Sequence, residues 1–96
     1  MTRRILIIED DAETREFISR GFVEEGFATE TAANGRDGLY LATDGSFDAI
    51  VLDRMLPGMD GLSVLKSLRA AAITTPVLLL TAMSVVDERV RGLRSG

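Results

Sequence analysis

Short apolar runs that end at a carboxylate constrain the fold of this chain more than any other feature. Residues 5–8 read Ile-Leu-Ile-Ile and lead into the acidic triplet 9–11, and residues 48–53 read Asp-Ala-Ile-Val-Leu-Asp. A continuous apolar run without polar alternation is typical of a strand covered on both faces, as in a parallel sheet. Residues 76–81 form a third such run, with Pro at the first position, where a missing N–H is tolerated.

Segments with helical spacing separate these runs. Residues 12–25 predict a helix because Gly26 follows where a left-handed C-terminal cap belongs. Residues 27–32 predict a weaker strand, and residues 36–43 predict a short helix. The residues expected to form the apolar stripes are Phe17, Ile18, Phe22 and Val23 in the first helix and Leu39 and Ala42 in the second.

Two further helices are predicted in the second half of the chain. Leu62, Leu65 and Leu68 mark a helix whose three leucines we expect in the core, and a later stripe after Ser84 consists of Val86, Val90 and Leu93. Strands that alternate with helices at this spacing imply right-handed crossovers and a doubly wound α/β sheet.

The charge and composition exclude several function classes. Fifteen acidic residues against eleven basic ones give a net charge of −4, which disfavours nucleic-acid binding by this segment. The chain has no Cys and no His, so any histidine chemistry must come from a partner. No apolar run resembles a signal-peptide core or reaches membrane-spanning length, so we expect a cytoplasmic location and no membrane contact.

Polar side chains follow the predicted strands. Glu9, Asp10 and Asp11 follow the first strand, Asp53 ends the third and Thr81 ends the fourth. Ligands of such sheets bind beyond the carboxyl ends of the strands, so we expect these groups to converge there. Each also has a simpler interpretation: a helix cap for the triplet, a turn former for Asp53 and a turn-capping hydroxyl for Thr81.

Crowded carboxylates point to a divalent cation. Carboxylates a few ångströms apart raise one another's pKa unless a cation neutralises them. Mg²⁺ takes oxygen ligands, usually one or two carboxylates with waters and phosphate oxygens, and Asp10, Asp53 and a backbone carbonyl just after Asp53 would suit it. Asp53 could then act as a nucleophile and form an acyl phosphate.

These motifs resemble a known family. Residues 5–11, residues 51–61 and residues 80–82 together are similar to the receiver domains of bacterial two-component response regulators. The resemblance implies a flavodoxin-like sheet with strand order 2-1-3-4, and a switch that takes a phosphoryl group from a sensor histidine kinase. It implies no enzyme beyond weak self-dephosphorylation. The Leu-Pro-Gly-Met-Asp-Gly segment resembles regulators that continue into a DNA-binding domain and control transcription.

The resemblance also implies roles for individual residues. Asp53 would be the phosphoacceptor, Asp10 a direct Mg²⁺ ligand, and Glu9 an acid acting mostly through a metal-bound water. Met55 would bind the ion through its backbone carbonyl, and Thr81 would be the switch hydroxyl.

One part of the family pattern is missing. Receiver domains carry a lysine at the end of a fifth strand, whereas the only lysine here is Lys66, in the third predicted helix. We therefore expect residues 1–96 to be a receiver domain without its fifth strand and last helix, which would accept phosphoryl poorly. The outer edge of the fourth strand, residues 77–80, would then be exposed and prone to self-association.

Three alternatives remain at this stage. A Mg²⁺-dependent phosphatase would share the acyl-phosphate chemistry, but it usually has a second acid two residues after the nucleophile, where this chain has Met55. A flavin-binding protein would share the sheet order, but the acidic residues 9–11 would repel the flavin phosphate. An inactive receiver scaffold would keep the fold without the switch.

Overall fold

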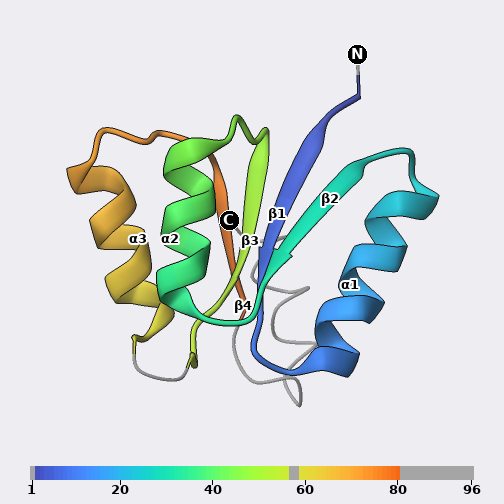
Figure 1. The fold of residues 1–96 in the computed structure, drawn as a ribbon, viewed down its shortest axis with the longest axis horizontal. Coiled ribbons are helices and arrows are strands. Elements are labelled where there is room, and N and C mark those ends of the chain that lie inside the picture. The colour runs from blue at the N-terminus through green and yellow to red at the C-terminus, as the bar shows by residue number, and fades with distance from the viewer. Residues whose placement is uncertain (1, 57–58, 81–96) are drawn as a thin grey trace, which may run out of the picture.

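The computed structural model describes residues 2–56 and 59–80 of the 96-residue chain. Within them the chain alternates between strands and helices in the order expected from the sequence (Figure 1). The elements are β1 (Arg4–Ile8), α1 (Ala12–Glu24), β2 (Ala28–Ala32), α2 (Gly35–Asp44), β3 (Ala49–Asp53), α3 (Gly61–Ala70) and β4 (Val77–Leu80).

The four strands form one parallel sheet in the order β2-β1-β3-β4. This confirms the predicted order and places β1 and β3 side by side in the middle of the sheet. The register pairs Ile8 with Ala32 on one side and with Leu52 on the other, and it pairs Asp53 with Leu80. The carboxyl ends of all four strands therefore meet at one edge of the sheet.

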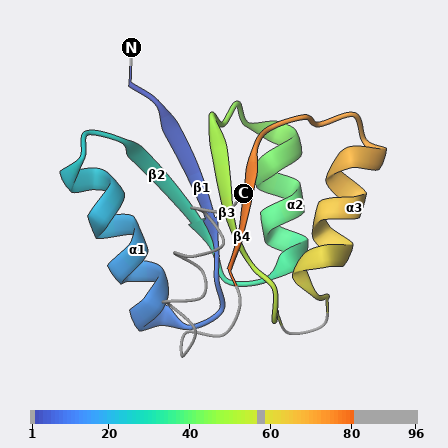
Figure 2. The same cartoon turned by 180° about the vertical axis from the view of Figure 1, so that it is seen from behind.

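Helices cover both faces of the sheet, with α1 on one side and α2 and α3 on the other (Figures 1 and 2). Alternate residues of the central strands point to opposite faces, which divides the core into two clusters. The cluster between the sheet and the helices α2 and α3 consists of Leu6, Ile8, Ala32, Ala42, Ile50, Leu52, Leu56, Val64 and Leu68. Facing α1 are Ile5, Ile7, Val51 and Leu80, with Ile18 and Phe22 packed against them.

A polar residue caps the start of each helix. The side chains of Asp11, Asn34 and Asp60 accept hydrogen bonds from backbone N–H groups three residues later. Such caps satisfy donors that the first helical turn leaves unpaired. At the other end of α1, Gly26 has a φ of +93°, as its predicted role in the cap requires.

The predicted apolar stripes were partly wrong. In α1, Phe17 and Val23 are 72% and 54% exposed, and only Ile18 and Phe22 pack against the sheet. In α2, Ala42 is buried and Leu39 packs against the core, as predicted.

The core residues of α3 also differ from the prediction. Leu62 is 40% exposed, whereas Val64 and Leu68 are fully buried. The inward face follows Gly61, Val64 and Leu68, a spacing of three and then four residues, and Leu62 lies outside it.

Arg4 holds the amino-terminal edge of the sheet together. Its backbone N–H donates to the Asp48 carboxylate at 2.7 Å, and its guanidinium donates to the Ser46 carbonyl at 3.2 Å. The guanidinium also pairs with Glu30 at 3.1 Å and lies 4.6 Å from the centre of the Phe47 ring. Arg4 therefore connects β1, β2 and the segment before β3, at the edge opposite the strand-end carboxylates.

None of the helices in the described residues is both long and apolar enough to cross a membrane. The fourth helix, predicted after Ser84, lies outside the described residues, as does Thr81.

Candidate metal centre

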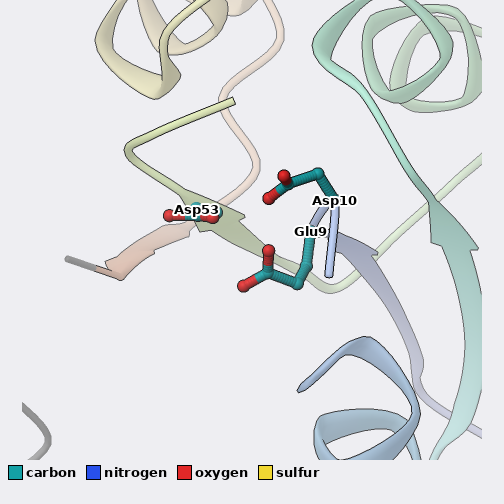
Figure 3. Close-up of side chains that lie close together, drawn as sticks. All are labelled: Glu9, Asp10 and Asp53. Atoms are coloured by element: carbon teal, nitrogen blue, oxygen red, sulfur yellow. The ribbon is translucent and has the colours of Figure 1, made fainter. Parts of the chain in front are cut away.

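Three carboxylates converge where β1 and β3 end. Oxygen atoms of Glu9, Asp10 and Asp53 all lie within 4.8 Å of one another. Figure 3 shows the three side chains close together, with Glu9 and Asp10 coming from the end of β1 and Asp53 from the end of β3. Glu9 is 3% exposed and Asp53 is 8% exposed, while Asp10 lies at the surface.

Backbone pairing at the strand ends fixes this arrangement. The Glu9 N–H donates to the Ala32 carbonyl of β2 at 3.0 Å, and the Arg54 N–H donates to the Leu80 carbonyl of β4 at 2.7 Å. Glu9 itself and Arg54, the residue after Asp53, are therefore hydrogen-bonded to the outer strands. Because β1 and β3 pair in parallel, the sheet places Asp53 next to Glu9 and Asp10.

Local hydrogen bonds orient two of the carboxylates. The Asp53 oxygen Oδ1 accepts the backbone N–H of Met55 at 3.0 Å, and the Glu9 oxygen Oε2 accepts that of Asp11 at 3.1 Å. The side chain of Met55 is 69% exposed. Its proposed role concerns the backbone carbonyl, and that role stays a prediction.

Asp11 has a different role from the other two acids of the triplet. Its carboxylate accepts the backbone N–H of Thr14 at 2.8 Å and the Thr14 hydroxyl at 2.7 Å. These hydrogen bonds lower the pKa of Asp11, as expected for a helix cap. The simpler interpretation of the triplet therefore holds for Asp11, and the cluster contains Glu9 and Asp10 without it.

Burial and crowding perturb the ionisation of Glu9. The pKa of Glu9 is raised to about 7, mainly by burial; the Asp11 N–H opposes this shift, and contacts with the Asp53 and Asp10 carboxyl groups add to it. A buried carboxyl group among other acids favours the protonated form because the charged form loses solvation and is repelled.

The residues present fit a hard divalent cation. Three carboxylates that share one small space, two of them nearly buried, provide the oxygen donors that Mg²⁺ takes in proteins. A cation at this position would also offset the repulsion that contributes to the raised pKa of Glu9. Asp10 and Asp53 from adjacent strand ends would hold it, with Glu9 beside them.

Two residues near the cluster were not predicted from the sequence. The Arg15 guanidinium donates to the backbone carbonyl of Glu9 at 2.9 Å. A Cβ atom at Gly61 would lie 2.5 Å from the Asp53 carbonyl oxygen, so glycine is needed for α3 to start against β3. A basic residue four positions after the triplet was the one available signal for Arg15, and the sequence carries none for this close approach at Gly61.

Comparison with known proteins identifies the family. The family model described as the response regulator receiver domain matches residues 5–96. The chain belongs to this family. Receiver domains are signalling domains rather than classical enzymes, so the phosphatase alternative is not favoured.

Curated relatives of this receiver domain are regulators of transcription by name. The transcriptional regulatory protein HprR of Escherichia coli K12 is 50% identical over 93 residues, which are 97% of this chain and 41% of that protein. The transcriptional regulatory protein CusR of the same strain is 42% identical, with the same coverage of both chains. The chain thus spans about two fifths of the length of these relatives.

Solved structures of receiver domains share the fold. The receiver domain of the Francisella response regulator 1452 is 38% identical with a TM-score of 0.82, and the match covers 99% of this chain and 78% of that one. The Thermotoga maritima response regulator TrrA, solved with Mg²⁺ and BeF, is 35% identical with a TM-score of 0.81; coverage is 86% and 72%. TrrA has also been solved in complex with the histidine kinase ThkA.

Proposed function

We propose that Asp53 accepts a phosphoryl group, with a Mg²⁺ ion held by Asp10, Asp53, the backbone carbonyl of Met55 and, less directly, Glu9. The observation that carries this proposal is the convergence of three carboxylate groups within 4.8 Å at adjacent strand ends. The TrrA structure with Mg²⁺ and BeF supports it, because that receiver shares the fold and binds these species.

The nucleophile is one oxygen of the Asp53 carboxylate. Because Oδ1 accepts the Met55 N–H, the side chain is held in one orientation and Oδ2 is the oxygen we assign to attack. The new bond joins this oxygen to phosphorus while the bond from phosphorus to the donor breaks, and the leaving group keeps that electron pair. Bound Mg²⁺ would supply positive charge that shields the phosphoryl oxygens from the acids.

The hydroxyl of Thr81 is proposed as the switch group. A hydroxyl can hydrogen-bond a new phosphoryl group and pull its own segment along. Thr81 follows β4 directly in the sequence, and β4 pairs with the strand that ends in Asp53.

A sensor histidine kinase is the proposed phosphodonor. Residues 1–96 contain no His, so a phosphohistidine donor must lie outside them. The complex of ThkA with TrrA supports a kinase as the partner. The names of the relatives support a role in transcription for the parent regulator, and we propose that residues 1–96 form one domain of it, located in the cytoplasm.

The proposal is tested by intact mass measurement after incubation with acetyl phosphate and Mg²⁺. We expect a gain of one phosphoryl group that is lost in Asp53→Asn and in the presence of a chelator. Asp44→Asn is the matched control, because Asp44 is exposed at the end of α2 remote from the cluster. Equal phosphorylation of Asp53→Asn and the wild type would overturn the proposal.

The rate of this reaction should be low for the 96-residue chain. Its single lysine, Lys66, is exposed on α3, so the described residues place no lysine ammonium beside Asp53. Without that charge, less of the negative charge that develops on the phosphoryl group is neutralised. A rate equal to that of a receiver with a strand-end lysine, measured with the same donor, would contradict this expectation, and any self-dephosphorylation should also be weak.

Self-association through β4 is proposed for the same chain. In the part of the chain that the structure describes, no strand pairs with β4 on the side away from β3. An unpaired apolar edge can bind the same edge of a second copy. Light scattering over a dilution series should show dimers or larger species at high concentration, and a monomer throughout would refute the proposal.

A further inference from the structure

Arg15 connects the first turns of α1 to the loop that carries the acidic residues. Its guanidinium nitrogen Nη1 donates to the carbonyl oxygen of Glu9 at 2.9 Å and lies 3.4 Å from that of Asp10. Its own backbone N–H donates to the carbonyl of Asp11 at 2.9 Å. Arg15 is half-buried, and its contact with the Glu9 carbonyl is partly shielded from water.

The two guanidinium contacts lie on either side of Asp10. The Glu9 carbonyl belongs to the peptide unit before Asp10, and the Asp10 carbonyl belongs to the unit after it. Fixing both units fixes the direction in which the Asp10 side chain leaves the backbone. This matters most at Asp10 because its side chain is exposed and is not held by surrounding packing.

Arg15 binds backbone rather than carboxylate oxygens. Within residues 2–56 and 59–80, the ion pairs join Arg4 to Glu30 and Arg20 to Glu16, and Arg15 forms none. Its positive charge therefore lies near the acidic cluster without forming an ion pair with a carboxylate of that cluster.

We propose that Arg15 is a positioning residue for the metal centre, holding the backbone at Glu9 and Asp10 so that both carboxylates stay near Asp53. This inference rests on the proposed function. Groups that orient metal ligands without touching the ion commonly change metal affinity when they are removed.

The sign of the effect separates this role from simple electrostatics. If Arg15 acted only through its charge, Arg15→Ala would remove a cation near the acids and strengthen Mg²⁺ binding. If Arg15 positions the loop, the same substitution weakens Mg²⁺ binding, because ordering the loop must then be done by the ion.

Calorimetric titration with Mg²⁺ alone tests this prediction. We expect Arg15→Ala to weaken binding about 10-fold, the lower end of the range for residues that orient ligands. The matched control is Arg20→Ala, which removes the same charge from the same helix and should leave the affinity unchanged, because the polar partner of Arg20 among the described residues is Glu16, at 2.9 Å. Wild-type or tighter binding by Arg15→Ala overturns the inference.

A spectrum of the metal-free chain gives a second readout. The amide nitrogens of Asp10 and Asp11 belong to the same peptide units as the two carbonyls, so their NMR signals should shift in Arg15→Ala and stay in place in Arg20→Ala. Phosphorylation by acetyl phosphate should need more Mg²⁺ in Arg15→Ala but reach the wild-type rate at saturation. A lower rate at saturating Mg²⁺ with unchanged Mg²⁺ dependence would overturn the positioning role.

Arg15→Met keeps the inference testable if the alanine variant does not fold. Methionine keeps an apolar stem but has no N–H donor, so it cannot hydrogen-bond the Glu9 and Asp10 carbonyls, and binding should again be weaker. Wild-type binding by this variant overturns the inference when the alanine variant is unfolded. A wild-type chain that binds no Mg²⁺ overturns the metal centre and this inference together. Binding that is lost in Asp10→Asn but kept in the folded Arg15 variants overturns the inference alone.

Discussion

At Glu9, burial separates the pKa of the folded chain from that of the unfolded chain. The folded value is about 7 and the ordinary value is 4.5. Between these pH values the unfolded chain has released the proton that the folded chain still binds. The folded state binds more protons in this window, so its stability falls as the pH rises from about 4.5 to about 7.

The first prediction follows from this difference. At about 1.4 kcal/mol per unit of pKa, the free energy of unfolding should fall by on the order of 3 kcal/mol between pH 4.5 and 7 in the absence of Mg²⁺. Urea unfolding at a series of pH values measures this decrease. Glu9→Gln should make the free energy of unfolding independent of pH in this range, and saturating Mg²⁺ should reduce its pH dependence in the wild type. The same pH dependence in Glu9→Gln would assign it to another group.

The caps at Asp11 and Asp60 act in a different pH window. Hydrogen bonds from Thr14 and Ser63 lower the pKa of these two carboxyl groups below 3.8. Their contribution is present above pH 3.8 and is lost as the pH falls through their folded pKa values. The stability that the caps lose at low pH and the stability lost through Glu9 between about pH 4.5 and 7 therefore fall in separate pH ranges.

The second prediction at the scale of residues concerns the substitution of Gly61. A Cβ atom there would lie 2.5 Å from the Asp53 carbonyl oxygen and 2.7 Å from the Arg54 Cα. Gly61→Ala must therefore move the start of α3 or the end of β3, at a cost of about 1–3 kcal/mol, and Mg²⁺ binding should weaken with it.

Gly21→Ala is the control for that substitution. Gly21 lies inside α1, and a Cβ atom added there would have nothing within 4 Å, so alanine should stabilise the chain by about 0.5–1 kcal/mol. Urea unfolding of both variants gives the comparison. Equal stability of the two variants would show that the contact at Gly61 is relieved without cost.

At the scale of elements, two leucines of α3 differ in their packing. Leu68 is fully buried, while Leu62 is 40% exposed. Leu68→Ala should lower the free energy of unfolding by about 2–5 kcal/mol. Leu62→Ala should lower it by less than about 1 kcal/mol, since surface substitutions have small effects. Thermal or urea unfolding measures both changes. Similar losses of stability in the two variants would contradict the packing described for α3.

These helices show where prediction from sequence ends. The strands β1, β3 and β4 could be predicted because their apolar runs are continuous, so no choice of face is needed. Each helix requires a choice of face, and the leucine spacing selected Leu62 instead of Val64. In the structure Gly61, Val64 and Leu68 are the buried residues of α3, and Leu62 lies outside this face.

The candidate site could be predicted to a similar extent. Glu9, Asp10 and Asp53 could be placed together because parallel strands end at one edge of the sheet. The cap formed by Asp11 could not be separated from them, since acids serve both roles. For Arg15 the one signal was its position four residues after the triplet, and the close approach at Gly61 is a contact between segments that no local pattern encodes.

At the scale of the whole molecule, the two edges of the sheet differ. The carboxyl edge holds the acidic cluster, and the amino edge is held by Arg4, whose side chain in the ion pair is 41% exposed. The exposed ion pair with Glu30 adds little to the free energy of unfolding, whereas the contact of the guanidinium with the Phe47 ring adds about 0.5–1 kcal/mol.

Arg4→Ala should therefore affect stability without affecting the metal centre. We expect a loss of about 1–2 kcal/mol from the ring contact and the hydrogen bond to Ser46, with unchanged Mg²⁺ affinity. Arg3→Ala, an exposed neighbour, should stay within about 0.5 kcal/mol of the wild type. Weaker Mg²⁺ binding in Arg4→Ala would show that the two edges are coupled.

The position of β1 between two cores limits how its length can vary. Its residues alternate between the cluster under α1 and the cluster under α2 and α3, and both clusters are apolar. Deleting one residue from this strand would move residues on one side of the deletion from one cluster to the other and leave its acidic end one step short of Asp53. Substitutions between aliphatic residues in β1 should therefore be tolerated far better than any insertion or deletion.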